Sequence, residues 1–208
     1  MEQTENRNKH RFSAQYLVRL SVLVAILFFL EISGLGIIKT PGLEFTIMQV
    51  PVIIGAITMG PSAGGILGGI FGLISFWECF GRSAFGAILL SIHPVGTFLV
   101  CVPTRILMGI LCGLIFRILK KLDKTGLWSF GAASLAGALL NTLFFMTTLV
   151  VFFYPTDYIQ GFVRMLGVAN PFGFVLAFVG VQGLLEAIIC FLAGAAISKA
   201  LYHVMHRK

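Results

Sequence analysis

Residues Phe45–Phe76 read FTIMQVPVIIGAITMGPSAGGILGGIFGLISF, which is two apolar segments joined by Gly60-Pro61, and they contain no charged residue. Gly-Pro dipeptides usually interrupt regular structure. The stretch therefore predicts two apolar helices, Ile47–Met59 and Ala63–Phe76, with a sharp turn between them.

The composition of the whole chain indicates a membrane protein. Of its 208 residues, 58% are hydrophobic and 11% are charged, whereas soluble domains carry about 25% charged residues. A spanning helix needs about 20 apolar residues, and four further apolar runs are long enough. These runs are Tyr16–Ile38, Val95–Leu119, Leu127–Tyr154 and Phe172–Tyr202. We therefore predict an all-α integral membrane protein with six transmembrane helices in one domain, 16–203, between polar tails 1–15 and 204–208. The apolar middle of the mixed stretch Trp77–Pro94 is too short to span and is expected within the protein or at the interface.

The basic residues predict the orientation of these helices, because lysine and arginine concentrate on the cytoplasmic side. With six spans and a cytoplasmic N-terminus, eleven basic residues lie inside and three, Lys39, Arg82 and Arg164, lie outside. The eleven are Arg7, Lys9, Arg11, Arg19, Arg117, Lys120, Lys121, Lys124, Lys199, Arg207 and Lys208. Both termini are therefore expected in the cytoplasm.

Glycines recur every four residues at the centre of the opening stretch. They are Gly60, Gly64, Gly68 and Gly72, with Gly65 and Gly69 as a second row. Residues four apart share one helix face, and glycine there lets another backbone approach closely. The rows indicate either tight helix packing or a smooth face that slides or approaches a ligand.

Arg105 is the clearest functional candidate, because charged residues inside a membrane are costly. It lies inside the run Val95–Leu119, shortly after Pro103. One interpretation is a buried ion pair with Glu186 that joins two helices. The other is that its planar guanidinium binds a carboxylate or phosphate of a substrate.

Four further polar residues lie in or near the outer halves of the predicted helices. The amide groups of Asn141, Gln182 and Gln49 need hydrogen-bond partners in a region that excludes lipid. Together these residues suggest a polar cavity open to the outside. His93, beside Pro94, is typical of an interfacial position, although it is also a candidate ligand. Each residue alone is compatible with a bond to a neighbouring helix.

The sequence lacks the patterns of an enzyme or a metal protein. It contains no HExxH, nucleophile elbow or GxxxxGK[ST] motif. Its cysteines, Cys79, Cys101, Cys112 and Cys190, form no CxxC pair, so three of the four are expected to be apolar residues within helices. We expect no cofactor, no metal and no ATPase domain.

The chain resembles the substrate-binding S components of energy-coupling-factor (ECF) vitamin transporters. The resemblance rests on Phe45–Phe76, on VPTRILMG at Val102–Gly109 and on KKLDKTG at Lys120–Gly126. It covers nearly the whole chain and is closest to the pantothenate-type and folate-type branch.

The resemblance implies a vitamin importer in the bacterial plasma membrane that is energised by partner subunits. The implied partners are a membrane scaffold (T) subunit and two cytoplasmic ATPases, on which the S component topples to release its vitamin. A small-residue pair on the first helix docks on the scaffold in this family. The matching residues here are Ser21 and Ala25, which otherwise indicate packing within the chain.

The resemblance also implies a pocket near the outer face, closed by the loop after the first helix. Pantothenate, a carboxylate, is the vitamin we favour. Folate, pyridoxine and a hydroxymethylpyrimidine remain alternatives, as does a self-sufficient secondary transporter or channel. The candidate substrate-binding residues are Glu44, Gln49, Arg82, His93, Arg105, Asn141 and Gln182.

Overall fold

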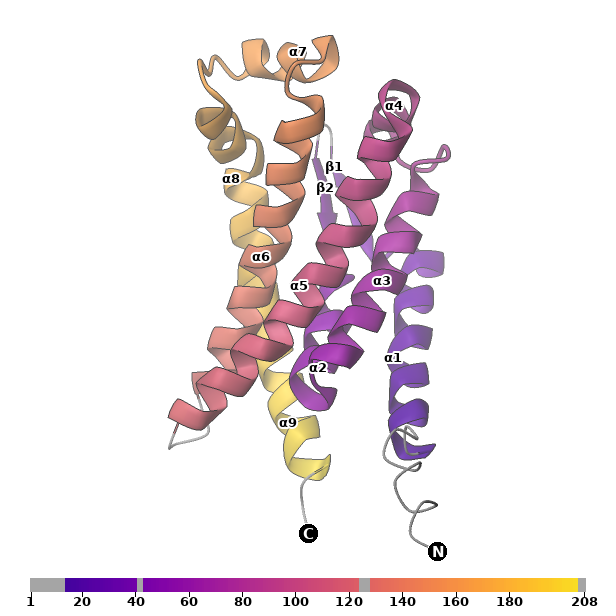
Figure 1. Cartoon of the computed structure of the whole chain (residues 1–208), viewed down its shortest axis with the longest axis vertical. Coiled ribbons are helices and arrows are strands. Elements are labelled where there is room, and N and C mark those ends of the chain that lie inside the picture. The colour runs from indigo at the N-terminus through magenta and orange to yellow at the C-terminus, as the bar shows by residue number, and fades with distance from the viewer. Residues whose placement is uncertain (1–13, 41–42, 124–127, 206–208) are drawn as a thin grey trace, which may run out of the picture.

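The computed structural model describes residues 14–40, 43–123 and 128–205, without the side chains of 37–40, 43–45, 181 and 182. The first half of the described chain forms α1 (Ala14–Ser33), β1 (Ile37–Thr40), β2 (Leu43–Thr46), α2 (Gln49–Met59), α3 (Pro61–Glu78) and α4 (Ala84–Ile92). The second half forms α5 (Pro94–Leu122), α6 (Trp128–Phe153), α7 (Asp157–Met165), α8 (Pro171–Ile189), a π-helical turn η2 (Cys190–Gly194) and α9 (Ala195–Met205). The long helices lie side by side as a bundle (Figure 1).

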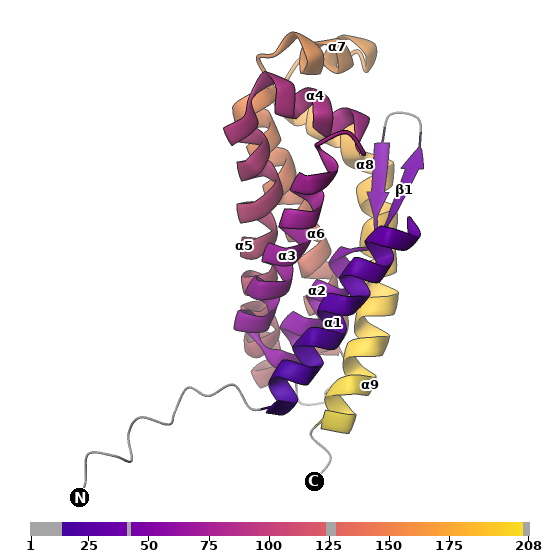
Figure 2. The same cartoon turned by 90° about the vertical axis from the view of Figure 1, so that its right-hand side faces the viewer.

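The two ends of the bundle differ in what they carry. The start of α1 and the end of α9 lie at one end, and α4 and α7 cap the other (Figures 1 and 2). Lys120 and Lys121 lie in the last turn of α5, at the end where α1 begins (Figure 1). Arg82 and Arg164 belong to the capped end, so these four described basic residues lie at opposite ends of the bundle.

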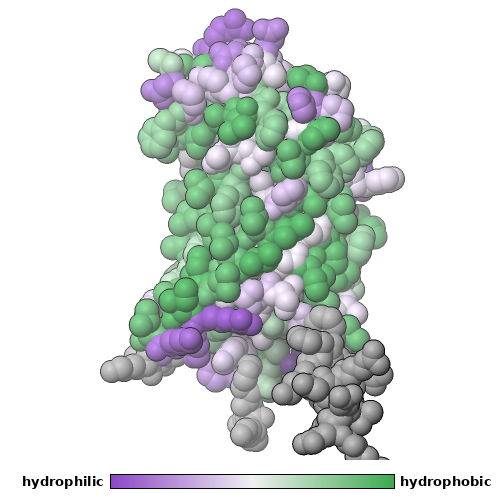
Figure 3. Space-filling view, in the orientation of Figure 1, coloured by the Kyte–Doolittle hydropathy of each residue, from purple (hydrophilic) through white to green (hydrophobic). Residues whose placement is uncertain are grey.

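Four of the described helices are long and apolar enough to cross a membrane. Three of them are α1, α5 and α6. The fourth is the continuous stretch Gly183–Met205, which runs from the second half of α8 through η2 to the end of α9. Hydrophobic side chains cover the middle of the face in Figure 3, and strongly hydrophilic ones gather near its two ends. The chain is therefore a multi-pass membrane protein whose helices follow the apolar runs of the sequence.

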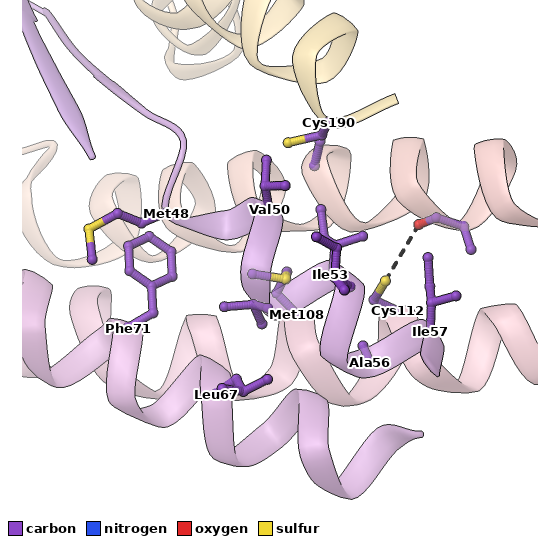
Figure 4. Packing of buried hydrophobic residues seen from close by; sticks show 14 of the residues in the cluster. Met48, Val50, Ile53, Ala56, Ile57, Leu67, Phe71, Met108, Cys112 and Cys190 are labelled. Atoms are coloured by element: carbon purple, nitrogen blue, oxygen red, sulfur yellow. Dashed lines mark hydrogen bonds between the residues drawn. The ribbon is translucent and has the colours of Figure 1, made fainter. Parts of the chain in front are cut away.

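α2 is the centre of the hydrophobic core. All of its residues from Gln49 to Thr58 are buried, as expected of a helix that is apolar on every side. Ile53 and Ala56 pack among Leu67 of α3, Met108 of α5 and other members of the same cluster (Figure 4). With 11 residues, α2 is too short to cross the bilayer by itself.

The segment before α2 differs from the loop expected at Lys39–Thr46. β1 and β2 pair as an antiparallel hairpin, with Thr40 opposite Leu43 and Ile37 opposite Thr46. Its base is held by the Ile47 N–H, which donates to the Gly36 carbonyl at 2.9 Å. Extended backbone near membrane depth must have its polar groups paired, and the hairpin does this while continuing the path of α2 towards the capped end (Figure 2).

The glycine rows of α3 pack against α5. A Cβ atom at Gly64 or Gly68 would overlap a carbonyl oxygen of α5, that of Gly109 or Arg105, and one at Gly72 would lie 2.7 Å from Val102 Cα. Of the two interpretations of the glycine rows, close helix packing is therefore the one the contacts support.

Candidate functional site

A cavity of about 420 Å³ lies in the capped half of the bundle. This volume is in the range of small-molecule pockets. The walls come from β2, α3, α4, α5, α6, α7 and α8. The wall residues that carry a polar or thiol group are Thr46, Ser75, Glu78, Cys79, Arg82, Ser83, Thr97, Cys101, Arg105, Asn141, Thr142, Tyr158 and Glu186.

Arg105 is the buried cation of this cavity. It is 6% exposed, and its Nη1 donates to the Val100 carbonyl and to Thr104 Oγ1. Its guanidinium carbon lies 4.9 Å from the ring centre of Phe145 and 5.5 Å from that of Phe71. Among the described residues Arg105 forms no ion pair within 4 Å, and its Nε has no hydrogen-bond partner. The ion pair with Glu186 is therefore absent, and a donor remains for an incoming anion.

Asn141 of α6 is a second lining residue with unused hydrogen-bonding capacity. It is 5% exposed, and its Oδ1 atom has no partner among the described residues. Since unpaired buried polar atoms are costly, Asn141 is suited to accept a hydrogen bond from a ligand.

Glu186 of α8 has a different role from the one expected. Its Oε1 accepts the Thr46 N–H at 2.9 Å, and its Oε2 accepts Gln49 Nε2 at 3.3 Å. The carboxylate thus ties the base of the hairpin and the start of α2 to α8. Gln49 is in this way a support of the hairpin and does not itself reach the cavity lining.

Arg82 lies at the rim of the cavity, in the turn between α3 and α4. Its Nη1 is 2.8 Å from Glu31 Oε1 in the last turn of α1, and its side chain is 53% exposed. Because the Arg82 side of this pair is open to solvent, which weakens the attraction, the pair mainly orients Arg82. A substrate anion would have to compete with Glu31 for it, which makes Arg105 the stronger anion site.

Aromatic rings close the cavity beneath the capping helices, and we call them the aromatic cap: Phe85 of α4, Tyr158 and Phe162 of α7, and Phe178 of α8. Phe85 lies 5.9 Å from Tyr158, and Phe162 lies 5.4 Å from Phe178, between ring centres. α7 is amphipathic and buries Ile159 and Val163 on the same side. The cap offers an apolar surface to the outer end of a ligand.

The remaining predicted residues lie elsewhere or outside what the structure describes. His93 is the N-cap of α5: its Nδ1 accepts the Gly96 N–H at 2.8 Å, and it is not in the cavity lining. The side chains of Glu44 and Gln182 are outside the described residues. Ser21 and Ala25 are exposed on α1, whereas Leu23, Leu27 and Glu31 form the buried face of this helix.

Several lining residues had no place among the candidates from the sequence. Cys101 is brought next to Glu78 and Cys79 only by the α3–α5 packing, and no local motif marks them. The aromatic cap depends on α4 and α7, which are too short to give a clear sequence signal. The period-4 spacing of Cys101 and Arg105 was the one signal available, because it places both on one face of α5.

The family of the chain follows from comparison with known proteins. A family model described as "ECF transporter, substrate-specific component" matches residues 15–198. The chain belongs to this family. It is therefore a transporter component of the cell membrane and not an enzyme.

Two curated relatives of this S component carry names that mention a substrate. The "Pantothenate transporter PanT" of Leuconostoc mesenteroides is 26% identical over 208 residues, which is 98% of this chain and 97% of the relative. The "Pantothenic acid transporter PanT" of Lactococcus lactis is 35% identical over 121 residues, 53% of this chain and 59% of the relative. The first of these similarities extends over nearly the full length of both proteins.

Proposed function

We propose that this S component binds pantothenate in the cavity of the capped half, with the vitamin's carboxylate on Arg105. The observation that carries the proposal is a buried guanidinium in the cavity wall, with no ion pair among the described residues and an Nε donor without a partner. Arginine pairs with carboxylates through short, charge-assisted hydrogen bonds. The names of both relatives support the choice of vitamin.

The two ends of pantothenate match the two kinds of wall. One end is a carboxylate, and the other carries two hydroxyls beside a gem-dimethyl carbon. With the carboxylate at Arg105, the amide lies between this site and the cap, against polar residues of the wall. The dimethyl end then packs against the aromatic cap, which excludes water from it.

We further infer six membrane crossings with both termini in the cytoplasm. α1, α5 and α6 are three crossings, α3 is a fourth, and α8, η2 and α9 form one continuous crossing. The hairpin and α2 together make up the sixth. The basic clusters near both termini support the orientation, which makes the capped half the outer half.

The energising partners inferred for this chain are a membrane T subunit and two cytoplasmic ATPases, with release by toppling of the S component. Family membership supports this assignment. The exposed pair Ser21 and Ala25 on α1 offers a small-residue surface on which another helix can approach closely.

The test of the substrate is equilibrium binding of radiolabelled pantothenate to the purified protein without ATP. Binding is expected to saturate at one vitamin per chain. Pantothenol, which has an alcohol in place of the carboxylate, is the matched control and should compete at least about 100-fold less well, because a buried charged pair is lost. Absence of pantothenate binding, or displacement by folate or pyridoxine instead, contradicts the assignment.

If Ser21 and Ala25 dock on the T subunit, Ala25→Trp should block uptake without affecting substrate binding. An indole there keeps partner helices apart, so uptake by the chain co-expressed with its energising module should fall to background. Binding by the purified variant should stay within about twofold of the unchanged protein, because Ala25 is exposed and is not a residue of the cavity lining.

Ile26→Trp is the matched control for this variant. Ile26 is also exposed but lies about 100° further round the helix, and its substitution should leave uptake intact. Equal uptake by both tryptophan variants contradicts docking at Ala25. Uptake by the chain alone in proteoliposomes contradicts the need for an energising module.

A further inference from the structure

Cys79 and Cys101 lie side by side in the wall of the cavity. Their Sγ atoms are 4.0 Å apart, and both residues line the cavity while each is 5% exposed. Cys79 caps the end of α3 and Cys101 lies in α5. The other two cysteines, Cys112 and Cys190, are buried and lie outside the cavity lining.

We propose that Cys79 and Cys101 form a redox-active dithiol site that takes small aliphatic disulfides entering the cavity, and that its oxidation weakens substrate binding. The effect on binding rests on the proposed pantothenate function, whereas formation of the disulfide does not. An oxidising environment on the outer side of the cell membrane is where such pairs form disulfides.

The surroundings favour reaction at Cys101 first. Arg105 follows one turn later on the same face of α5, and a nearby positive charge favours the thiolate, which is the form that attacks a disulfide. Cys79 is held more firmly, because its thiol donates to the Ser75 carbonyl at 3.4 Å.

The reaction proceeds by two thiol–disulfide exchanges. The Cys101 thiolate attacks one sulfur of the small disulfide, forms a mixed disulfide and releases one thiol. The Cys79 thiolate then attacks the Cys101 sulfur and releases the second thiol. The two cysteines are oxidised by two electrons, and the small disulfide is reduced to two thiols.

Closing the bond changes the cavity wall. The two sulfurs must approach from 4.0 Å to about 2.05 Å. The helix backbones are already in contact nearby, since a Cβ at Gly72 would lie 2.7 Å from Val102 Cα. The movement therefore falls on the two side chains and on the end of α3.

The displaced Cys79 sulfur also supports α4. A Cβ at Gly86 of α4 would lie 2.6 Å from Cys79 Sγ, so this sulfur fits directly against the α4 backbone. Rotating it towards Cys101 removes that support, and α4 carries Phe85 of the aromatic cap. The oxidised protein is thus expected to hold pantothenate about tenfold more weakly.

The experiment treats purified protein with 2-hydroxyethyl disulfide and counts free thiols by mass spectrometry after alkylation under denaturing conditions. The count should fall from four to two, and peptide mapping should place the bond between Cys79 and Cys101. A Cys112→Ala/Cys190→Ala variant should fall from two free thiols to none, and dithiothreitol should restore both. A Cys79→Ala variant should form no intramolecular bond.

Pantothenate affinity is then measured before and after oxidation in the Cys112→Ala/Cys190→Ala variant. A tenfold loss that dithiothreitol reverses supports the proposal. A bond that involves Cys112 or Cys190, no bond at all, or a bond that leaves the affinity unchanged overturns it. If the reduced protein binds no pantothenate, the proposed substrate fails while the thiol count still tests the dithiol.

Discussion

Arg105→Ala should weaken pantothenate binding by roughly 150-fold, equivalent to about 3 kcal/mol. The substitution removes the buried guanidinium to which we assign the vitamin's carboxylate, and it leaves that carboxylate in an apolar wall beside Phe71 and Phe145. Isothermal titration calorimetry with the purified variant measures the loss. Pantothenol, which lacks the charge, should bind the variant and the unchanged protein about equally.

The same substitution should not unfold the protein. Arg105 forms no ion pair among the described residues, so its removal leaves no buried carboxylate without a partner, and an unpaired buried charge is itself costly. The melting temperature without ligand should therefore be kept or raised. Arg117→Ala, which removes an exposed arginine near the other end of α5, is the control and should bind normally. Near-normal pantothenate affinity in Arg105→Ala contradicts the carboxylate assignment.

Two polar residues of the cavity, Arg105 and Asn141, can be identified from the sequence, because a polar side chain inside an apolar run is costly in lipid. Arg105 and Asn141 were marked as polar groups inside apolar runs, and both line the cavity. The same reasoning selects Gln49 and His93, which lie outside the cavity lining and bond to Glu186 and to the Gly96 N–H. Polarity within an apolar run therefore indicates that a residue needs a partner but not whether the partner is a ligand or the protein.

The apolar runs predicted the long helices, and the hairpin was missed for a physical reason. The apolar run Ile47–Met59 predicts a helix, which is present as α2, whereas the preceding residues predict a loop where β1 and β2 pair as a hairpin. The sequence does hold a turn signal, Pro41-Gly42, between Ile37-Ile38 and Leu43. However, the bond that ties the hairpin to α8 comes from Glu186, 140 residues from Thr46, and a contact of that separation leaves no local pattern.

The glycine rows of α3 determine both how α3 packs against α5 and where the proposed carboxylate site lies. Gly68 lies against the carbonyl of Arg105, so the contact that joins α3 to α5 also sets the depth of the proposed carboxylate site. Gly69 is its immediate neighbour, and a Cβ there would meet Ile106 Cγ1 at an ordinary 3.6 Å. The two positions share a helix and a residue type and differ in what they touch.

Gly68→Ala should therefore destabilise the protein by about 3 kcal/mol and reduce pantothenate binding, whereas Gly69→Ala should change stability by no more than about 1 kcal/mol. A methyl group at Gly68 overlaps a backbone oxygen, which can be relieved only by moving α3 and α5 apart and Arg105 with them. At Gly69 the added methyl meets a flexible side chain and lowers the backbone entropy lost on folding. Thermal unfolding in detergent with and without pantothenate measures both effects. Equal melting temperatures and affinities for the two alanine variants contradict the assigned role of the Gly68 contact.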